Sequence, residues 1–166
     1  MPRIEGFDAF YASEYPRAVA VAHALLGGGL VAEDVVQETF LATYRQWDRV
    51  SRYENPRAWV RRVLVNRATS SLRRRSAEWR AVMRLSGRVD PGWVSAIEPE
   101  SSEVWKAVSQ LPKRQAQSVA LYYVDQLSLD EIGEVLGCSA GTVKTHLSRA
   151  RTRLGRKLNE FNEVTG

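Results

Sequence analysis

The segment LSLDEIGEVLGCSAGTVKTHLSRARTRL (127–154) predicts two helices joined by a tight turn. Ser128 and Glu131 have the spacing of a capping box, in which each side chain accepts a hydrogen bond from the other residue's backbone N–H. Gly137 can take the left-handed conformation that ends the first helix, and Ser139 can cap the second. The sequence therefore predicts a helix-turn-helix.

The second helix of this pair separates a buried stripe from a polar face. Val143, Leu147 and Ala150 recur at helical spacing, which predicts that they face inward. A helix with polar donors near its N-terminus, placed after a tight turn, has the geometry that enters the major groove of DNA. The candidate DNA-contacting residues are Ser139, Thr142, Lys144, Thr145, His146, Ser148, Arg149 and Arg151.

Two of these residues have distinct predicted roles. Lys144 is the candidate for reading a base and Arg149 for contacting a phosphate, because they lie five apart on the exposed flank. The alternative is an ordinary helical hairpin whose charged face is merely solvated. The basic run Arg149, Arg151, Arg153, Arg156 and Lys157 favours DNA over that alternative. His146 carries less weight, since a lone exposed histidine is usually solvated.

The composition fits a globular protein that approaches polyanions. The 166 residues are 44% hydrophobic and 26% charged, with 24 lysines and arginines against 19 acidic residues. This positive excess favours nucleic acid as a partner. The lone cysteine, Cys138, excludes an internal disulfide and a thiolate metal cluster, which predicts a reducing, cytoplasmic location. No apolar run approaches the roughly 20 residues that span a bilayer, so we expect no membrane insertion.

The spacing of apolar residues predicts an all-α fold of two small helical domains joined by a linker, the second carrying the helix-turn-helix. We expect the first domain at residues 1–75, the linker at 76–100 and the second domain at 101–166. The prolines and scattered acids of the linker predict no fixed structure. The second domain should hold helices over 104–110 and 113–124 before a pair of short helices.

Helix signals divide the first domain. Pro16 is expected in the first turn of a second helix, where its missing N–H costs nothing, and the glycines 27–29 should end that helix. A third helix is expected to open at Glu33, whose charge suits the positive end of a helix dipole. After a polar loop, Pro56 should restart a helix that ends near residues 73–75.

Three segments, in this order, resemble the extracytoplasmic-function class of bacterial sigma factors. They are AEDVVQETFLATYRQW (32–47), NPRAWVRRVLVNRATSSLRRR (55–75) and the region 111–154. The resemblance implies that the first binds core RNA polymerase, that the second reads and melts the minus-ten promoter element, and that the third binds the minus-thirty-five element. It also implies an anti-sigma factor as a partner. The segment 61–75 looks closer to an actinobacterial subgroup of the class.

The resemblance implies roles for matching positions of the first domain. Asp34, Gln37 and Glu38 match the face that docks on the polymerase clamp, and the alternative is a solvated helix face. The candidates for minus-ten DNA are Ser51, Arg52, Tyr53 and Asn55 in a loop, and Arg62, Asn66, Arg73 and Arg74 in the following helix. Ser70 stands where many relatives carry an aspartate, so the resemblance leaves the minus-ten preference of this chain open.

Two other classes of function could use a helix-turn-helix or a basic chain. A stand-alone helix-turn-helix regulator is the alternative, but residues 1–75 lack the alternating strands and helices of a receiver domain. An enzyme acting on nucleic acid would need metal-binding acids, a paired nucleophile and base, or a phosphate-binding loop, and the sequence shows none of these patterns. We therefore expect no catalytic residue, metal or cofactor. The expected partners are core RNA polymerase, promoter DNA and an anti-sigma factor.

Overall fold

The computed structural model describes residues 6–27, 29–86 and 103–165. Within these ranges every regular element is a helix, which confirms the all-α prediction. The elements are α1 (Phe7–Leu26), α2 (Gly29–Arg45), α3 (Trp47–Val50), α4 (Pro56–Ser86), α5 (Glu103–Ser109), α6 (Lys113–Val119), the π-helical turn η2 (Ala120–Val124), α7 (Leu129–Leu136) and α8 (Ala140–Thr165). No described helix combines the length and the apolar composition of a membrane span.

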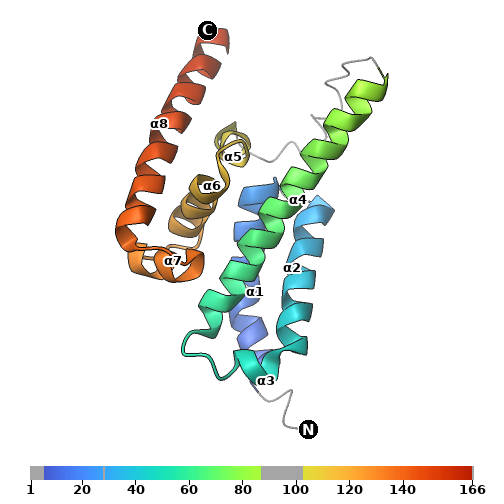
Figure 1. Cartoon of the computed structure of the whole chain (residues 1–166), viewed down its shortest axis with the longest axis vertical. Helices are drawn as coiled ribbons and strands as arrows, with labels where there is room; N and C mark the ends of the chain where they lie inside the picture. Colours follow the sequence, from blue (N-terminus) through green and yellow to red (C-terminus); the bar gives the residue numbers. More distant parts are fainter. Residues whose placement is uncertain (1–5, 28, 87–102, 166) are drawn as a thin grey trace.

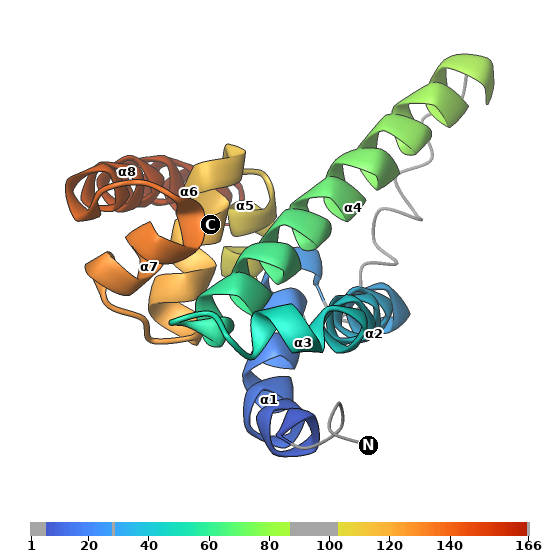
Figure 2. The same ribbon diagram turned by 60° about the horizontal axis from the view of Figure 1, so that its bottom comes forward.

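The first half of the chain is a bundle of α1, α2 and α4, with the short α3 at one end (Figures 1 and 2). Ala22, Val36 and Leu64 lie fully buried where these helices meet. The predicted end of α1 at the glycines is confirmed, because Gly27 caps the helix in the left-handed conformation with φ 80°. α2 begins at Gly29, about one turn before the predicted start.

The predicted start of a second helix at Pro16 is wrong, because Pro16 lies inside α1. A proline within a helix removes one backbone hydrogen bond, here the bond to the carbonyl of Ala12. Ala12 and Pro16 are both exposed, so water can hydrogen-bond that carbonyl and the helix continues. One long helix therefore replaces the two that the sequence predicts.

Two helices run further than the sequence predicts. α4 continues to Ser86, past the expected start of the linker at residue 76. Residues 76–86 contain no glycine or proline and are rich in helix-favouring residues, which explains the extension. The rest of the expected linker, residues 87–100, lies outside the described part of the chain. The sequence predicted a pair of short helices at the C-terminal end. The structure instead has the short α7 followed by α8, which is 26 residues long.

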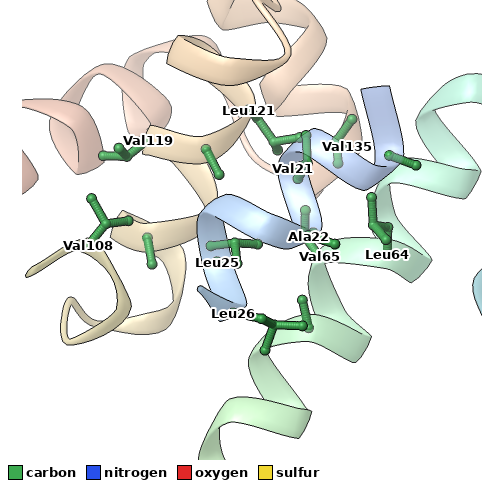
Figure 3. Close-up of a cluster of buried hydrophobic side chains, with 14 of the residues drawn as sticks. Val21, Ala22, Leu25, Leu26, Leu64, Val65, Val108, Val119, Leu121 and Val135 are labelled. Carbon is green, nitrogen blue, oxygen red and sulfur yellow. The ribbon is translucent and has the colours of Figure 1, made fainter. Parts of the chain in front are cut away.

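The two halves of the chain share one apolar core. α1 contacts η2 and α5, and α4 contacts α7. Figure 3 shows Leu25 of α1 between Val108 of α5 on one side and Leu64 of α4 on the other, with Leu121 of η2 above it. Because helices from both halves bury the same side chains, each half supplies part of the other's core.

The helix-turn-helix has the predicted caps. Ser128 Oγ accepts a hydrogen bond of 3.1 Å from the Glu131 N–H, and Glu131 Oε2 accepts one of 2.8 Å from the Ser128 N–H, which confirms the capping box. Gly137 ends α7 in the left-handed conformation with φ 71°. Ser139 Oγ accepts a hydrogen bond of 3.1 Å from the Thr142 N–H and so caps α8.

The turn between α7 and α8 folds back tightly onto α7. The Cys138 N–H donates a hydrogen bond of 3.0 Å to the Gly133 carbonyl. A Cβ atom placed on Gly133 would lie only 2.6 Å from the Cys138 carbonyl oxygen, which is a backbone atom and cannot swing away. Gly133 therefore permits the close approach that fixes the angle between the two helices.

Replacing Leu25 by alanine should lower the free energy of unfolding by about 2–5 kcal/mol, because its side chain is 1% exposed and leaves a cavity between the two halves. Leu30→Ala is the matched control, since Leu30 is 77% exposed and should change stability by no more than about 0.5 kcal/mol. Urea denaturation followed by circular dichroism measures both values. Similar losses in the two variants would contradict the shared core.

Gly133→Ala and Gly155→Ala should change stability in opposite directions. Helix propensity alone favours alanine by about 1 kcal/mol at both positions. A Cβ on Gly155 meets nothing within 4 Å, so Gly155→Ala should stabilise the protein. Gly133→Ala should destabilise it by about 1–3 kcal/mol through overpacking against the turn. Thermal unfolding of the two variants tests this prediction. A Gly133→Ala variant that is more stable than the parent would contradict the close approach of the Cys138 carbonyl to Gly133.

Candidate nucleic-acid interface

The polar face of α8 is arranged as a DNA-contacting helix would require. Val143, Leu147 and Ala150 are buried against α6 and α7, as predicted. The opposite face exposes Thr142, Lys144, Thr145, Ser148, Arg149 and Arg151. Ser139 is also exposed, but its hydroxyl is occupied in capping the helix. The first turns of α8 therefore present both hydroxyl and basic groups to solvent.

Basic side chains from three helices lie near one another beside α8. Partial burial, and then the positive charges of Arg114 and Arg149, lower the pKa of His146 below its usual value. Burial, Arg114 and Arg73 likewise lower the pKa of Lys113. This lowered pKa favours the neutral imidazole of His146, which can both donate and accept a hydrogen bond. The surrounding guanidinium groups make this region electropositive.

Arg151 is held by two tyrosines that the sequence did not single out. Arg151 Nε donates a hydrogen bond of 2.8 Å to the hydroxyl of Tyr123. Its guanidinium carbon lies 5.8 Å from the ring centroid of Tyr122 and 5.7 Å from that of Tyr123, within cation–π range. The adjacent aromatic pair just before the helix-turn-helix is the sequence signal that could have indicated this contact.

The polar face of α2 lies away from the second half of the chain. Asp34, Gln37 and Glu38 are all exposed and share one side of the helix at spacings of three and four. Figure 2 places α2 on the far side of α1 and α4 from α6, α7 and α8. Glu38 pairs with Arg67 at 3.3 Å, but both side chains are largely exposed, so the pair adds little stability.

The minus-ten candidates in the loop between α3 and α4 fall into two groups, one exposed and one half-buried. Ser51, Arg52 and Tyr53 are exposed at the end of the bundle. Asn55 is half-buried, and its Oδ1 accepts a hydrogen bond of 3.1 Å from the Ala58 N–H at the start of α4. Its Nδ2 donates a hydrogen bond of 3.1 Å to Glu134 on α7. Asn55 therefore links the two halves of the chain.

The candidates on α4 divide in the same way. Arg62 donates hydrogen bonds of 2.9 Å and 2.8 Å to the carbonyls of Glu134 and Val135, at the C-terminal end of α7. Asn66 Oδ1 lies 3.3 Å from the donating Nε2 of the buried Gln117. Further along, Arg73 and Arg74 are exposed, as is Ser70. The second half thus contacts this face at Arg62 and Asn66 and leaves its continuation open.

An ion cluster that the sequence reading missed lies beneath these contacts. Arg61 is 2% exposed, and its Nη2 pairs with Glu14 of α1 at 2.8 Å. Its Nε pairs closely with Asp125, which follows η2. Arg57 also reaches Glu14, at 2.9 Å. Arg61 stands one turn before the buried Leu64, so helical spacing is the signal that placed it on the inward face.

Comparison with protein families gives two matches in order along the chain. Residues 10–78 match the family described as sigma-70 region 2, and residues 101–154 match sigma-70 region 4. The RNA polymerase sigma-E factor of Streptomyces antibioticus is 31% identical over 128 residues, which cover 76% of this chain and 70% of that protein. The ECF RNA polymerase sigma factor SigW of Bacillus subtilis is 28% identical over 154 residues, covering 85% and 82%.

Solved structures share the arrangement of helices. The sigma factor RpoE of Bartonella quintana, crystallised with the anti-sigma factor NepR, superposes with a TM-score of 0.67 at 26% identity, covering 92% of this chain and 96% of that one. CnrH, in complex with the cytosolic domain of CnrY, gives a TM-score of 0.65 at 21% identity, which shows the fold alone. With both conserved regions present and relatives of one kind aligned over most of its length, the chain belongs to the extracytoplasmic-function branch of the sigma-70 family of RNA polymerase sigma factors.

Proposed function

We propose that this chain directs RNA polymerase to specific promoters by binding the core enzyme through α2 and promoter DNA through α4 and α8. The observation that most supports this proposal is the start of α8. This helix follows a capped turn, presents its first polar side chains to solvent, and begins within the residues that match sigma-70 region 4. The role requires no chemistry on this chain, so the proposal is a non-enzymatic factor that acts where promoter DNA is, in the cytoplasm.

The proposed division of labour follows the two family regions. Residues 1–75 would bind the polymerase and read and melt the minus-ten element, and residues 101–166 would bind the minus-thirty-five element, with 76–100 as the linker. A stand-alone regulator, the alternative, would have no use for a region 2 domain and is not favoured by the match over residues 10–78. Placement in an actinobacterial subgroup rests on segment 61–75 alone, since the relatives come from varied bacteria.

The exposed face of α2 supports its proposed role in binding the polymerase. Asp34, Gln37 and Glu38 combine two carboxylates with one amide on a surface that no other helix described in the structure covers. Such a face suits a partner that offers cationic and hydrogen-bonding groups. Its distance from α8 would let the polymerase and upstream DNA bind the chain at the same time.

The α8 face supports base reading and phosphate binding by different residues. Lys144 is exposed on the first turns, where a helix in the major groove reaches base edges. Arg149 lies further along the helix, nearer the expected path of the phosphates, and His146, whose neutral form is favoured, lies between them. Arg151, oriented by Tyr123, adds a second phosphate ligand.

The exposed loop between α3 and α4 supports capture of an unpaired minus-ten base. Unstacking one base costs a few kcal/mol, which polar groups and an aromatic ring in a pocket can offset. Ser51, Arg52 and Tyr53 supply such groups at the end of the bundle, and Arg73 and Arg74 supply charge for the adjoining phosphates. An anti-sigma factor is proposed as a further partner, because the related RpoE binds one.

The double variant Gln37→Ala, Glu38→Arg should lose binding to bacterial core RNA polymerase, because it removes the amide and reverses a charge on the α2 face. Co-elution with core polymerase on a sizing column measures the loss. The control is Ser76→Ala, Glu78→Arg, which makes the same change in net charge on an exposed part of α4. No binding by the unaltered protein, with DNA binding intact, would favour the stand-alone regulator.

Lys144→Ala should cost about 1–3 kcal/mol at one base position of the minus-thirty-five element, because a base contact discriminates among sequences. Arg151→Ala should instead weaken binding to all sequences alike and reduce the slope of log K against log salt by about 1. Anisotropy titrations of reconstituted holoenzyme with single-base duplex variants at several salt concentrations measure both effects. If both variants lost the same binding free energy on every DNA sequence, the assignment of α8 as the recognition helix would be wrong.

A further inference from the structure

We propose that basic side chains from both halves of the chain form a binding site for a linear oligophosphate, either inorganic or the phosphate chain of a nucleotide. This basic cluster consists of Arg73 on α4, Lys113 and Arg114 on α6, and His146 and Arg149 on α8. The proposed function assigns no role to Lys113 and Arg114, and the ligand is neither the polymerase nor promoter DNA. The inference therefore goes beyond that function.

The stretches of sequence that carry these side chains contain no acidic residue. Residues 55–77, 104–124 and 138–158 hold neither aspartate nor glutamate, although 19 of the 166 residues of the chain are acidic. A helix surface that is merely solvated usually mixes charges of both signs. Three acid-free stretches that meet in the fold therefore indicate a surface suited to an anion.

The contact between Gln117 and Thr69 brings the α4 and α6 parts of the cluster together. Gln117 Nε2 lies 3.1 Å from Thr69 Oγ1. Arg73 follows Thr69 by one helical turn and so lies on the same face of α4, and Lys113 precedes its own contact residue by one turn of α6. Burial, then the charge of Arg114 and then that of Arg73, lower the pKa of Lys113. The basic groups of the two halves are therefore neighbours.

The packing of α6 on α8 adds the remaining members. Figures 1 and 2 both place α6 between α4 and α8, and α6 contacts α8 along its length. Burial, then the charge of Arg114 and then that of Arg149, lower the pKa of His146. Because Arg114 acts on both Lys113 and His146, it lies between the two parts of the cluster. The positive surface is therefore continuous from α4 to α8.

The charges of the cluster are not balanced by nearby acids. Among the residues that the structure describes, no carboxylate forms a salt bridge with any member of the cluster. Arg73, Arg114 and Arg149 are exposed, with Lys113 and His146 half-buried beside them. Like charges held close together repel one another, which disfavours the folded chain. An anion bound among them replaces this repulsion by attraction, and three exposed guanidinium groups are available to contact it.

The groups of the cluster match the chemistry of a chain of phosphates. An arginine guanidinium binds a phosphate through two parallel N–H···O bonds, and a lysine binds it as a point charge. Because the cluster extends over three helices, a single phosphate cannot reach every member, whereas a chain of several can. Such a chain is flexible enough to follow the surface from α4 to α8, whereas duplex DNA is stiff over about 150 base pairs. A linear oligophosphate therefore fits the cluster best.

A bound oligophosphate would compete with promoter DNA, and this consequence rests on the proposed function. Arg73, His146 and Arg149 are proposed DNA contacts. A guanidinium that holds an oligophosphate is not available to a DNA phosphate. The concentration of oligophosphate would then set how readily the chain binds promoters.

Isothermal titration calorimetry of the full chain with sodium tripolyphosphate, in about 0.15 M salt, tests the site directly. The double variant Lys113→Gln, Arg114→Gln should bind about tenfold more weakly, because it removes two charged contacts. The control, Arg80→Gln, Arg84→Gln, makes the same change in net charge on the exposed end of α4, which Figure 2 shows projecting away from α6 and α8. It should change the affinity by less than about twofold, because salt screens charges at that separation.

Arg73→Gln tests whether the site includes both halves of the chain. It should weaken binding by about threefold, because it removes one charged contact from the first half. Thermal unfolding without ligand shows that each variant is folded. If the double variant is not folded, Arg114→Gln alone replaces it, since Arg114 is exposed and its only printed partner is the Gln117 side chain.

ATP and tripolyphosphate carry the same chain of three phosphates, so they distinguish the two sources of ligand. Tighter binding of tripolyphosphate would identify an inorganic chain, and tighter binding of ATP would identify a nucleotide. Either result supports the site if the double variant weakens it. Poly-glutamate of equal charge should bind much more weakly, because each of its carboxylates lies on a separate side chain that loses rotamer freedom on binding.

Absence of tripolyphosphate binding by the unaltered protein would overturn the proposal. Equal losses in the double variant and the control would also overturn it, as would equally tight binding of poly-glutamate, because the cluster would then attract polyanions without a defined site. Failure of the proposed function is distinguishable from these results. The calorimetry contains neither polymerase nor DNA, whereas failure of that function appears as absent co-elution with core polymerase.

Discussion

Burial of the C-terminal half of α1 is the constraint on which the rest of the structure depends. From Ala18 to Leu26 this helix is apolar on nearly every side, and Ala18, Val21, Ala22, Ala24, Leu25 and Leu26 are all buried. A helix of this kind cannot rest on a single neighbour, because one contact leaves its other faces in water. α2 and α4 cover one side, and η2 and α5 cover the other. The two family regions are therefore packed against one shared helix.

This constraint explains why polar groups decide how firmly the halves are joined. Apolar packing against α1 is non-directional and would tolerate sliding, whereas the Arg61 cluster and the contacts of Gln117 each require one register. The hydrogen bonds of Arg62 to the end of α7 add a third fixed point. Apolar burial brings the halves together, and directional bonds specify how they fit.

The sequence predicted best those features that local chemistry determines. The capping box at Ser128, the left-handed Gly137 and the buried stripe of α8 were all confirmed, because caps, turns and helical spacing act within a few residues. The predicted start of a second helix at Pro16 was wrong. The Ala12 carbonyl, which loses its helical hydrogen bond at Pro16, lies in an exposed part of α1 where water can bind it, and the sequence alone does not show this exposure. The roles of the polymerase- and DNA-binding residues stay predictions.

Contacts between distant parts of the chain could not be predicted in this way. The residues in the pairs Arg61–Asp125 and Arg62–Glu134 lie far apart in sequence, and nothing in their local patterns links them. Spacing could place Arg61 on the inward face of α4, but only the packing of α7 and η2 identifies its partners. For the same reason the sequence predicted the two helical domains but not the apolar core that they share.

The contacts of Tyr122 and Tyr123 with Arg151 affect the conformational entropy that this side chain would lose on binding DNA. A free arginine side chain samples many rotamers, and restricting it on binding costs up to about 2 kcal/mol. The Tyr123 hydroxyl and the two rings already restrict Arg151 in the folded chain, so folding rather than complex formation bears most of that loss. In the proposed role of Arg151, an arginine ordered in advance would contribute more net affinity per phosphate contact than its solvated neighbours on the same helix. The aromatic pair before the helix-turn-helix would then favour DNA binding without touching a nucleotide.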